Sequence, residues 1–283
     1  MNLFVVNTGF FKLDGGAMFG VVPKTLWSKT NTADENNLCT WAMRCLLVED
    51  EGKYILIDNG IGNKQDAKFL GHYHLHGTDT LTSSLQSIGI APSQITDNIL
   101  THLHFDHCGG GITLDSSKQY VKTFFENAVY WSNADHWKWA TEPNPREKAS
   151  FLKENILPMK ESGQLNFISP DSSPFSNISF LFADGHTDKQ MLPHIKYKGR
   201  TIVFAADLLP SVGHIPLPYV MGYDTRPLLT MQEKSKFLLD AAQNEYIIFL
   251  EHDPIHECCT VINTEKGVRL KETFSLKEAL DRI

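Results

Sequence analysis

The sequence lacks the features of a protein that binds membranes or nucleic acids. None of its apolar runs approaches the roughly 18 residues that a transmembrane helix needs. Its 26 Lys and Arg residues are outnumbered by 33 Asp and Glu residues, which gives a formal net charge of −7. A phosphate backbone or an acidic membrane surface calls for a basic footprint, so we expect neither as a partner.

Signals for secretion, cross-linking and modular organisation are also missing. Residues 1–16 contain no basic stretch followed by a long apolar one, so we expect a cytoplasmic protein. The five cysteines are odd in number and show no CxxC spacing, which predicts reduced, mostly buried thiols. No linker, low-complexity tract or fixed-period repeat interrupts the chain, so we expect a single domain over residues 1–283.

Short apolar runs bounded by turn residues recur along the chain. They predict strands, with a Gly15-Gly16 turn before residues 17–22 and a hairpin between residues 43–50 and 54–60. Further strands are predicted at residues 95–102, 128–131, 178–186, 195–207 and 246–253, and helices at residues 81–90, from Asn133, at 228–242 and after Ser275. Strands alternating with helices favour an α/β fold with helices outside paired sheets.

The most informative segment is Leu-Thr-His-Leu-His-Phe-Asp-His-Cys-Gly-Gly, residues 100–110. It packs His102, His104, Asp106 and His107 into six positions. Such a cluster is costly in an apolar core, whereas imidazole nitrogens and carboxylate oxygens suit zinc and similar divalent ions. The Gly109–Gly111 run lets the backbone turn close to the site. The sequence therefore predicts a metal site here, with ligands for parts of two ions.

Three later residues could complete the ligand set. His186, Asp207 and His252 each follow an apolar run that predicts a buried strand. Chemistry is commonly carried by loops at strand ends, so all three are candidate ligands.

Six other histidines are assigned neither a metal role nor a catalytic one. Alternating histidines at 72, 74 and 76 lack a carboxylate and a preceding buried strand, so we expect a polar loop there. We expect His136, His194 and His256 to be surface or structural residues.

The HxHxDH string, with later His, Asp and His at strand ends, resembles the metallo-β-lactamase superfamily over nearly the whole chain. The resemblance implies an αββα sandwich of two mixed β-sheets flanked by helices. Asp58, in Leu-Ile-Asp-Asn-Gly, is similar to that superfamily's early Asp-Thr-Gly residue, which braces a metal-binding histidine.

The resemblance also implies a ligand assignment and a mechanism. His102, His104 and His186 would bind one ion, Asp106, His107 and His252 a second, with Asp207 bridging both. Zinc is favoured, with iron or manganese as alternatives. A hydroxide shared by the two ions would attack a carbonyl or phosphoryl centre. Asp106 could assist proton transfer in addition to binding metal.

Segments 11–27 and 206–218 are similar to the branch of N-acyl-homoserine-lactone lactonases and methyl parathion hydrolase-like enzymes. One position departs from this pattern: familiar lactonases place a Tyr three residues after the bridging Asp, where this chain has Pro210. His214, Tyr219 or Tyr223 could take over the role of that Tyr in contacting the substrate, and of these His214 and Tyr223 are our candidates for catalytic residues.

The favoured activity is hydrolysis of a lactone or related ester, including acyl-homoserine lactones. An apolar or aromatic pocket would suit such substrates. Its candidate lining residues are Met18, Phe19, Trp27, Trp131 and Tyr219.

Alternatives remain open at this stage. They are a phosphotriester or aryl-ester hydrolase of the same branch, an iron-dependent sulfur dioxygenase-like enzyme and, less favoured, a non-enzymatic metal-binding sensor. The expected partner is a small-molecule substrate, and a homodimer is compatible with the aromatic content.

Overall fold

The computed structural model describes residues 1–117 and 121–283. The chain divides into two compact units. Unit 1 comprises residues 1–9 and 43–174, and unit 2 comprises residues 10–42 and 175–283. The boundary falls within the two longest strands, β1 (Asn2–Asp14) and β2 (Leu38–Asp50). Each unit is described by itself below, and the prediction of a single domain stays a prediction.

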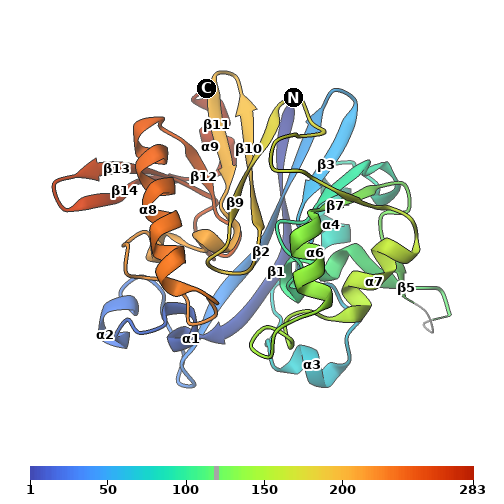
Figure 1. The fold of residues 1–283 in the computed structure, drawn as a ribbon, viewed down its shortest axis with the longest axis horizontal. Helices are drawn as coiled ribbons and strands as arrows, with labels where there is room; N and C mark the ends of the chain where they lie inside the picture. The colour runs from blue at the N-terminus through green and yellow to red at the C-terminus, as the bar shows by residue number, and fades with distance from the viewer. Residues whose placement is uncertain (118–120) are drawn as a thin grey trace. The chain divides into compact units, whose positions relative to one another are not determined.

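The six-stranded sheet associated with unit 1 has the order β1-β2-β3-β4-β7-β8 (Figure 1). Its remaining strands are β3 (Lys53–Ile57), β4 (Asp97–Ile99), β7 (Val129–Ser132) and β8 (Leu165–Phe167). β2 and β3 form the predicted antiparallel hairpin, while β3, β4, β7 and β8 pair in parallel. Parallel pairing brings the carboxyl ends of β3 and β4 to one edge, which is where Asp58 and the histidine-rich segment begin.

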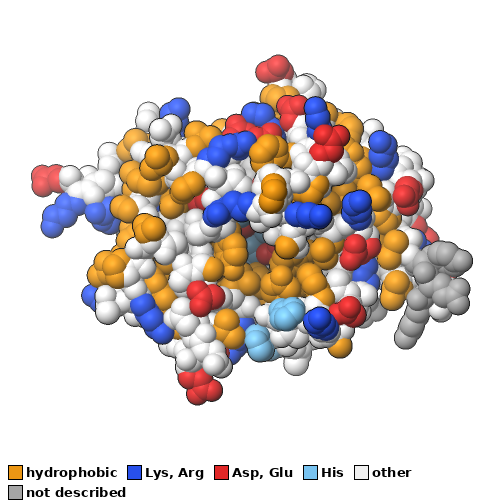
Figure 2. Space-filling view, turned by 60° about the horizontal axis from the view of Figure 1, so that its bottom comes forward, with side chains coloured by type: hydrophobic (Ala, Val, Ile, Leu, Met, Phe, Trp, Pro, Cys, Tyr) orange, Lys and Arg blue, Asp and Glu red, His pale blue; other side chains and the backbone are white. Residues whose placement is uncertain are grey.

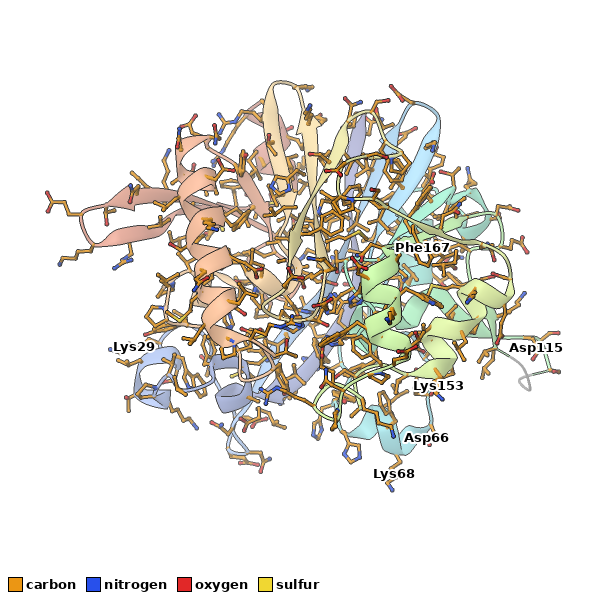
Figure 3. All side chains as sticks on the ribbon, in the orientation of Figure 1. Lys29, Asp66, Lys68, Asp115, Lys153 and Phe167 are labelled. Atoms are coloured by element: carbon orange, nitrogen blue, oxygen red, sulfur yellow. The ribbon has the colours of Figure 1, made fainter. Side chains whose placement is uncertain are left out.

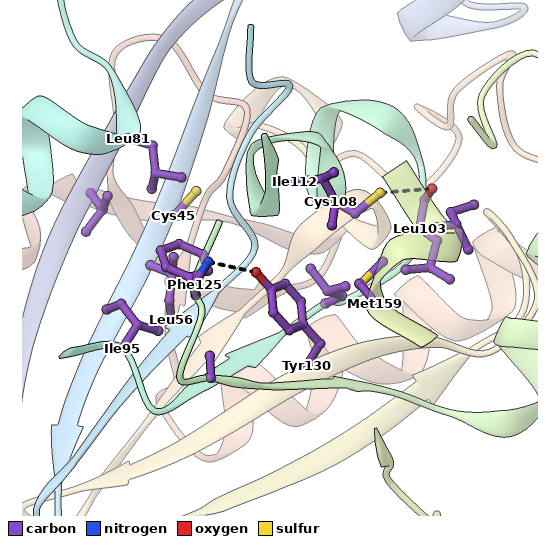
Figure 4. Packing of buried hydrophobic residues seen from close by; sticks show 14 of the residues in the cluster. Cys45, Leu56, Leu81, Ile95, Leu103, Cys108, Ile112, Phe125, Tyr130 and Met159 are labelled. Atoms are coloured by element: carbon purple, nitrogen blue, oxygen red, sulfur yellow. Dashed lines mark hydrogen bonds between the residues drawn. The ribbon is translucent and has the colours of Figure 1, made fainter. Parts of the chain in front are cut away.

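Helices cover this sheet and close its core. They are α3 (Ala67–Gly71), α4 (Leu81–Ser87), α5 (Phe105–Cys108), α6 (Ala134–Thr141) and α7 (Lys153–Glu161). A small two-stranded sheet pairs β5 (Ile112–Leu114) with β6 (Val121–Thr123). Figure 4 shows part of the core, where the Tyr130 hydroxyl accepts the Phe125 N–H (3.1 Å). The same hydroxyl donates to Gly111 O (2.7 Å). The Cys108 thiol donates to Leu103 O (3.3 Å), so the core reaches into the histidine-rich segment.

The six-stranded sheet of unit 2 has the order β14-β13-β12-β11-β10-β9. Its strands are β9 (Ile178–Ala183), β10 (Gln190–Tyr197), β11 (Arg200–Phe204), β12 (Ile247–Phe249), β13 (Cys258–Thr264) and β14 (Gly267–Phe274). β11 and β12 are parallel, and the other neighbours are antiparallel. Helix α8 (Pro227–Gln243), orange in Figure 1, packs on β13 through a core that includes Phe237, Leu238 and Val261.

Two predictions about unit 2 need correction, and one is confirmed. Residues 17–22 are not a strand, because α1 (Gly15–Phe19) begins where the Asp14 carboxylate accepts the Ala17 N–H (2.8 Å) and caps the helix. The run 195–207 is not one strand, because a turn at Lys198-Gly199 separates β10 from β11. Helix α9 (Leu276–Asp281) has the predicted capping box between Ser275 and Glu278.

Short helical segments complete the described fold. These are α2 (Lys24–Trp27) and the 3₁₀ turns η1 (Pro92–Gln94), η2 (Gly109–Gly111), η3 (Ala206–Leu208) and η4 (Val212–His214).

The surface and the thiols agree with the composition. All five cysteines are free and buried, which confirms their prediction as reduced thiols. Figure 2 shows acidic and basic side chains on the same face with hydrophobic side chains between them. Among the described residues, no helix is both long and apolar enough to span a bilayer.

Candidate metal centre

The histidine-rich segment follows β4 and is buried throughout. His102 and His107 have no exposed surface, while His104 and Asp106 are 8% and 9% exposed. The helix α5 begins at Phe105, so Asp106 and His107 lie in a helical turn directly after His102 and His104. Four polar side chains are thus gathered where an apolar core would otherwise form.

Asp58 anchors two of these histidines from the end of β3. Its Oδ1 accepts the Thr101 N–H (2.8 Å), and its Oδ2 accepts the Thr101 hydroxyl (2.7 Å) and the His107 Nδ1–H (3.0 Å). Because Thr101 donates its only hydroxyl hydrogen to Asp58, it accepts a hydrogen from His102 Nδ1 (3.1 Å). This chain of hydrogen bonds leaves Nε2 of both His102 and His107 without a hydrogen, in the form that binds metal.

His102 and His104 converge through their ring nitrogens. His102 Nε2 lies 3.0 Å from His104 Nδ1, and His107 Nε2 lies 3.7 Å from Asp106 Oδ2. The other nitrogen of His104, Nε2, lies 3.4 Å from Oε1 of the buried Glu147. Two nitrogen lone pairs at 3.0 Å repel each other unless a proton or a cation lies between them. The donor set therefore fits a divalent ion such as zinc.

Unit 2 contains a second cluster, centred on Asp207. One carboxylate oxygen of Asp207 lies 3.0 Å from His186 Nε2, and the other lies 3.0 Å from His252 Nε2. Asp207 follows β11 in the 3₁₀ turn η3, where its N–H donates to Gln190 Oε1 (3.1 Å). The structure thus brings together the three later residues that the sequence predicts as ligands.

Both histidines of this second cluster are held through Nδ1. His186 Nδ1–H donates to Asp224 Oδ1 (3.0 Å), and His252 Nδ1–H donates to Ala42 O (2.8 Å). Burial lowers the pKa of His186, but Asp207 and Asp224 outweigh that effect and raise it to about 10. This cluster therefore favours positive charge, which is the electrostatic condition that a metal site requires.

The glycine run beside the first cluster is required by close backbone contacts. A Cβ on Gly110 would lie 2.0 Å from Asn59 O, and one on Gly109 would lie 2.2 Å from Ile61 O. The Gly110 N–H donates to Gly60 O (2.7 Å), which ties the run to the Asp58 loop. The prediction that these glycines permit close approach is confirmed.

Three of the predicted pocket residues are buried together in unit 2. Phe19 stacks between the Trp27 ring (centroids 5.3 Å apart) and the His214 ring (4.4 Å), with Tyr219 edge-on at 6.3 Å. Met18 is also buried, and its carbonyl accepts the His214 Nε2–H (2.9 Å). Their place in a substrate pocket stays a prediction, and of this group Tyr219 retains partial exposure.

His214 has a partner at each ring nitrogen. Since Nε2–H donates to Met18 O, Nδ1 accepts from the Ser211 hydroxyl (2.9 Å). Burial lowers the pKa of His214 to about 3, and Lys234 adds to that lowering. The ring is therefore neutral and held in place, which suits an anchor for the loop better than a proton carrier. Among the three replacements considered for the lactonase Tyr, the half-buried Tyr219 and the exposed Tyr223 are the better candidates.

Three tryptophans lie in unit 1, among them the predicted pocket residue Trp131. The Trp131 indole N–H donates to Asp97 Oδ1 (2.8 Å) in unit 1. Trp137 is buried against Phe167, labelled beside α6 in Figure 3, with ring centroids 6.2 Å apart. Trp139 is only half-buried, as its two-residue spacing from Trp137 predicts.

The remaining histidines behave as predicted. The histidines at 72, 74 and 76 are exposed, which confirms the polar loop. His136 is buried in a structural role, because its Nε2 accepts the Leu103 N–H (2.8 Å).

Sequence reasoning missed most residues that orient the histidines. These are Thr101, Glu147, Asp224 and the carbonyl of Ala42. Only Thr101 carried a usable signal, since a hydroxyl directly precedes the first histidine. Asp224 lies 38 residues from His186, and no spacing rule connects such a pair.

Comparison with known proteins identifies the family. The model of the metallo-β-lactamase superfamily matches residues 44–252, a span that includes every predicted metal ligand. The chain therefore belongs to the metallo-β-lactamase superfamily, and the predicted fold class is confirmed.

Its relatives include lactonases at low identity. An N-acyl homoserine lactonase of Bacillus cereus is 23% identical over 259 residues, 86% of this chain and 90% of that protein. A probable metal-dependent hydrolase from Staphylococcus aureus has a TM-score of 0.86 and 28% identity, over 96% of this chain and 98% of that one. AidC, a dizinc quorum-quenching lactonase solved with a product, has a TM-score of 0.78 and 23% identity, over 96% and 94%. The chain is thus a metal-dependent hydrolase of this superfamily with lactonase-like relatives.

Proposed function

We propose that the chain hydrolyses lactones or related esters with two divalent metal ions, zinc being favoured over iron or manganese. The residues that would hold the ions are His102, His104, Asp106, His107, His186, Asp207 and His252. The observation that carries this proposal is the orientation of the histidines. Hydrogen bonds at Nδ1 of His102, His107, His186 and His252 direct Nε2 of each ring at its own cluster, and Nε2 of His104 lies 3.4 Å from the buried Glu147 carboxylate.

The ions and the protein would contribute different parts of the chemistry. When bound, two divalent ions supply Lewis acidity and lower the pKa of water toward neutrality. Asp58 and Asp224 hold Nδ1 of His107 and His186, so that Nε2 of each ring faces its own cluster, and burial of the clusters limits bulk water. Asp106, at the first turn of α5, remains our candidate for moving a proton during the reaction.

The substrate class is proposed from the relatives and from the loop at 208–223. N-acyl homoserine lactonases are among the curated relatives, and this loop carries Tyr219 and Tyr223 in accessible positions. A phenolic hydroxyl can donate a hydrogen bond to an ester carbonyl, the role that Pro210 cannot perform. An acyl-homoserine lactone or an aryl ester would suit a site of this kind.

The test combines metal counting with a substrate panel. Purified protein should contain close to two metal ions per chain and turn over at least one of acyl-homoserine lactones, aryl esters or phosphotriesters. His104→Ala should lose metal and activity while remaining folded, whereas His72→Ala, in the exposed loop, should keep both. A protein with two ions that turns over none of these substrates, or His104→Ala with full metal content, would overturn the proposal.

A further inference from the structure

Glu147 is a buried carboxylate in a segment whose neighbours face solvent. It is 3% exposed, whereas Arg146 and Lys148 on either side are exposed. Burying a carboxylate is unfavourable unless hydrogen bonds or an opposite charge compensate for the lost water. The position of Glu147, between α6 and α7, therefore calls for a specific set of partners.

One carboxylate oxygen of Glu147 is fixed by two donors from its own segment. Oε2 accepts the Trp139 indole N–H (2.7 Å) and the Asn144 amide N–H (2.6 Å). The Glu147 backbone N–H donates to Asn144 Oδ1 (3.1 Å), which holds the turn closed. These contacts set the orientation of the carboxylate, so its second oxygen has a defined direction.

That second oxygen faces a predicted metal ligand. Oε1 lies 3.4 Å from His104 Nε2, and the Phe151 ring flanks the imidazole with centroids 4.7 Å apart. A carboxylate accepts only, so this contact favours a hydrogen on Nε2 of His104. Nδ1, the nitrogen that would bind metal, lies within hydrogen-bond distance of His102 Nε2 (3.0 Å), so a metal ion would take the place of the hydrogen between them.

We propose that Glu147 is a positioning residue for the metal centre, which selects the tautomer of His104 and joins that ligand to the α6–α7 segment. The inference rests on the proposed function, because it assigns Glu147 a role toward the same metal ions. It gives His104 the kind of partner that Asp58 gives His107 and Asp224 gives His186. Metal binding and the order of residues 139–150 would consequently depend on each other.

Glu147→Gln tests this role with a minimal change in shape. The indole and amide donors retain the glutamine oxygen at the Oε2 position, so the new NH₂ group faces His104 Nε2. That nitrogen must then accept, which moves the imidazole hydrogen to Nδ1 and blocks the metal-binding lone pair. Loss of such an outer partner typically lowers metal affinity by roughly 10- to 100-fold.

The experiment has a metal-free arm and a zinc arm. Long-range ¹H–¹⁵N spectra of the full-length, metal-free protein should show a hydrogen on Nε2 of His104 in the wild type and none on that nitrogen in Glu147→Gln. Zinc affinity, measured by competition with a chromogenic chelator, should fall in Glu147→Gln. It should stay unchanged in Glu142→Gln, an exposed carboxylate of the same segment.

A second variant guards against misfolding. Glu147→Asp keeps the charge but is too short to reach both the Trp139–Asn144 donors and His104, so zinc affinity should fall to a value between the other two. Circular dichroism checks that each variant is folded. Equal zinc affinity in wild type and Glu147→Gln, or the absence of a hydrogen on Nε2 of His104 in the metal-free wild type, would overturn the inference. Failure of the wild type to bind any divalent ion would instead overturn the proposed function, and the tautomer spectra would still decide the role of Glu147.

Discussion

The five histidines proposed as metal ligands share one arrangement, in which the nitrogen pointing away from the cluster faces a neighbouring polar group. The partners are a hydroxyl, two aspartates, a glutamate and a backbone carbonyl, contributed by Thr101, Asp58, Asp224, Glu147 and Ala42. Fixing the ring and its tautomer before metal arrives reduces the ordering cost of binding. The chain therefore presents its ligands in a form prepared for a cation.

His214 shows how burial of a single residue can govern acid stability. Its pKa is lowered by burial to about 3 in the folded protein, against about 6.5 for an exposed histidine. Between these two pH values the unfolded chain binds a proton that the folded chain does not. The contribution of His214 to the free energy of unfolding is therefore complete above pH 6.5. It is lost as the pH drops toward 3, by up to about 1.4 kcal/mol per pH unit.

We expect His214→Gln to unfold with a shallower pH dependence than the wild type between pH 7 and 4. Chemical unfolding of metal-free protein over this range measures the slope. His256→Gln, at a partly exposed position, serves as the matched control and should retain the steep dependence. Parallel slopes for the wild type and His214→Gln would show that another group dominates.

Four of the proposed ligands could be recognised in the sequence because their spacing and chemistry are local, whereas most of their hydrogen-bond partners could not. His102, His104, Asp106 and His107 occupy one short segment, so their identity is visible without a fold. Asp224 and Glu147 become partners only after strands and loops have been placed. Distance along the chain hides such pairs from any pattern of residue types.

Helix α8 organises two loops of unit 2 at the scale of an element. Near its middle, Glu233 accepts the backbone N–H groups of Asp184 and Gly185 (2.8 and 2.9 Å), next to His186. Lys234, fully buried, donates to the carbonyls of His214 (2.9 Å), Pro216 (3.3 Å) and Tyr219 (2.7 Å). One helix turn thus supports both a ligand loop and the proposed substrate loop.

Lys234→Met should loosen the substrate loop and leave the metal ligands in place. The variant removes three hydrogen bonds while keeping a long apolar stem, so we expect a raised KM, unchanged metal content and faster hydrogen exchange in residues 214–220. Lys236→Met, exposed on the same helix, should resemble the wild type in all three. Loss of metal from Lys234→Met, or exchange rates equal to those of the wild type, would contradict this role.

Prediction of the elements succeeded where hydrophobic periodicity was strong and failed where capping decided the outcome. Helix α8 and the β2–β3 hairpin follow their patterns closely. Residues 17–22 are apolar enough for a strand, but the Asp14 cap starts a helix instead. A local hydrogen bond outweighed β propensity there, as is common for short segments.

At the scale of the whole molecule, the chain belongs to the metallo-β-lactamase superfamily and carries buried groups that favour a cation. The five imidazoles and two carboxylates of the proposed ligand set are at most 9% exposed, and their burial without a metal ion is unfavourable. Metal should therefore stabilise the folded protein as a whole, beyond its role in the reaction.

We expect zinc to raise the thermal unfolding temperature of the metal-free wild type. Binding to the folded state alone contributes about 2.7 kcal/mol when free zinc is 100 times its dissociation constant. Scanning calorimetry over a zinc titration, with chelator-treated protein as reference, measures the effect. His104→Ala should show a clearly smaller shift, and an equal shift in that variant would point to binding elsewhere.

The Gly109–Gly111 run has a consequence for laboratory evolution of the enzyme. Its backbone contacts leave no room for even a methyl group at Gly110, so a saturation library at these positions should yield almost only inactive clones. Substitutions in the glycine run would abolish activity as substitutions of the proposed ligands would, although glycine takes no part in the chemistry. Variants with altered substrate range should instead be sought at exposed positions of the proposed substrate loop such as Leu217.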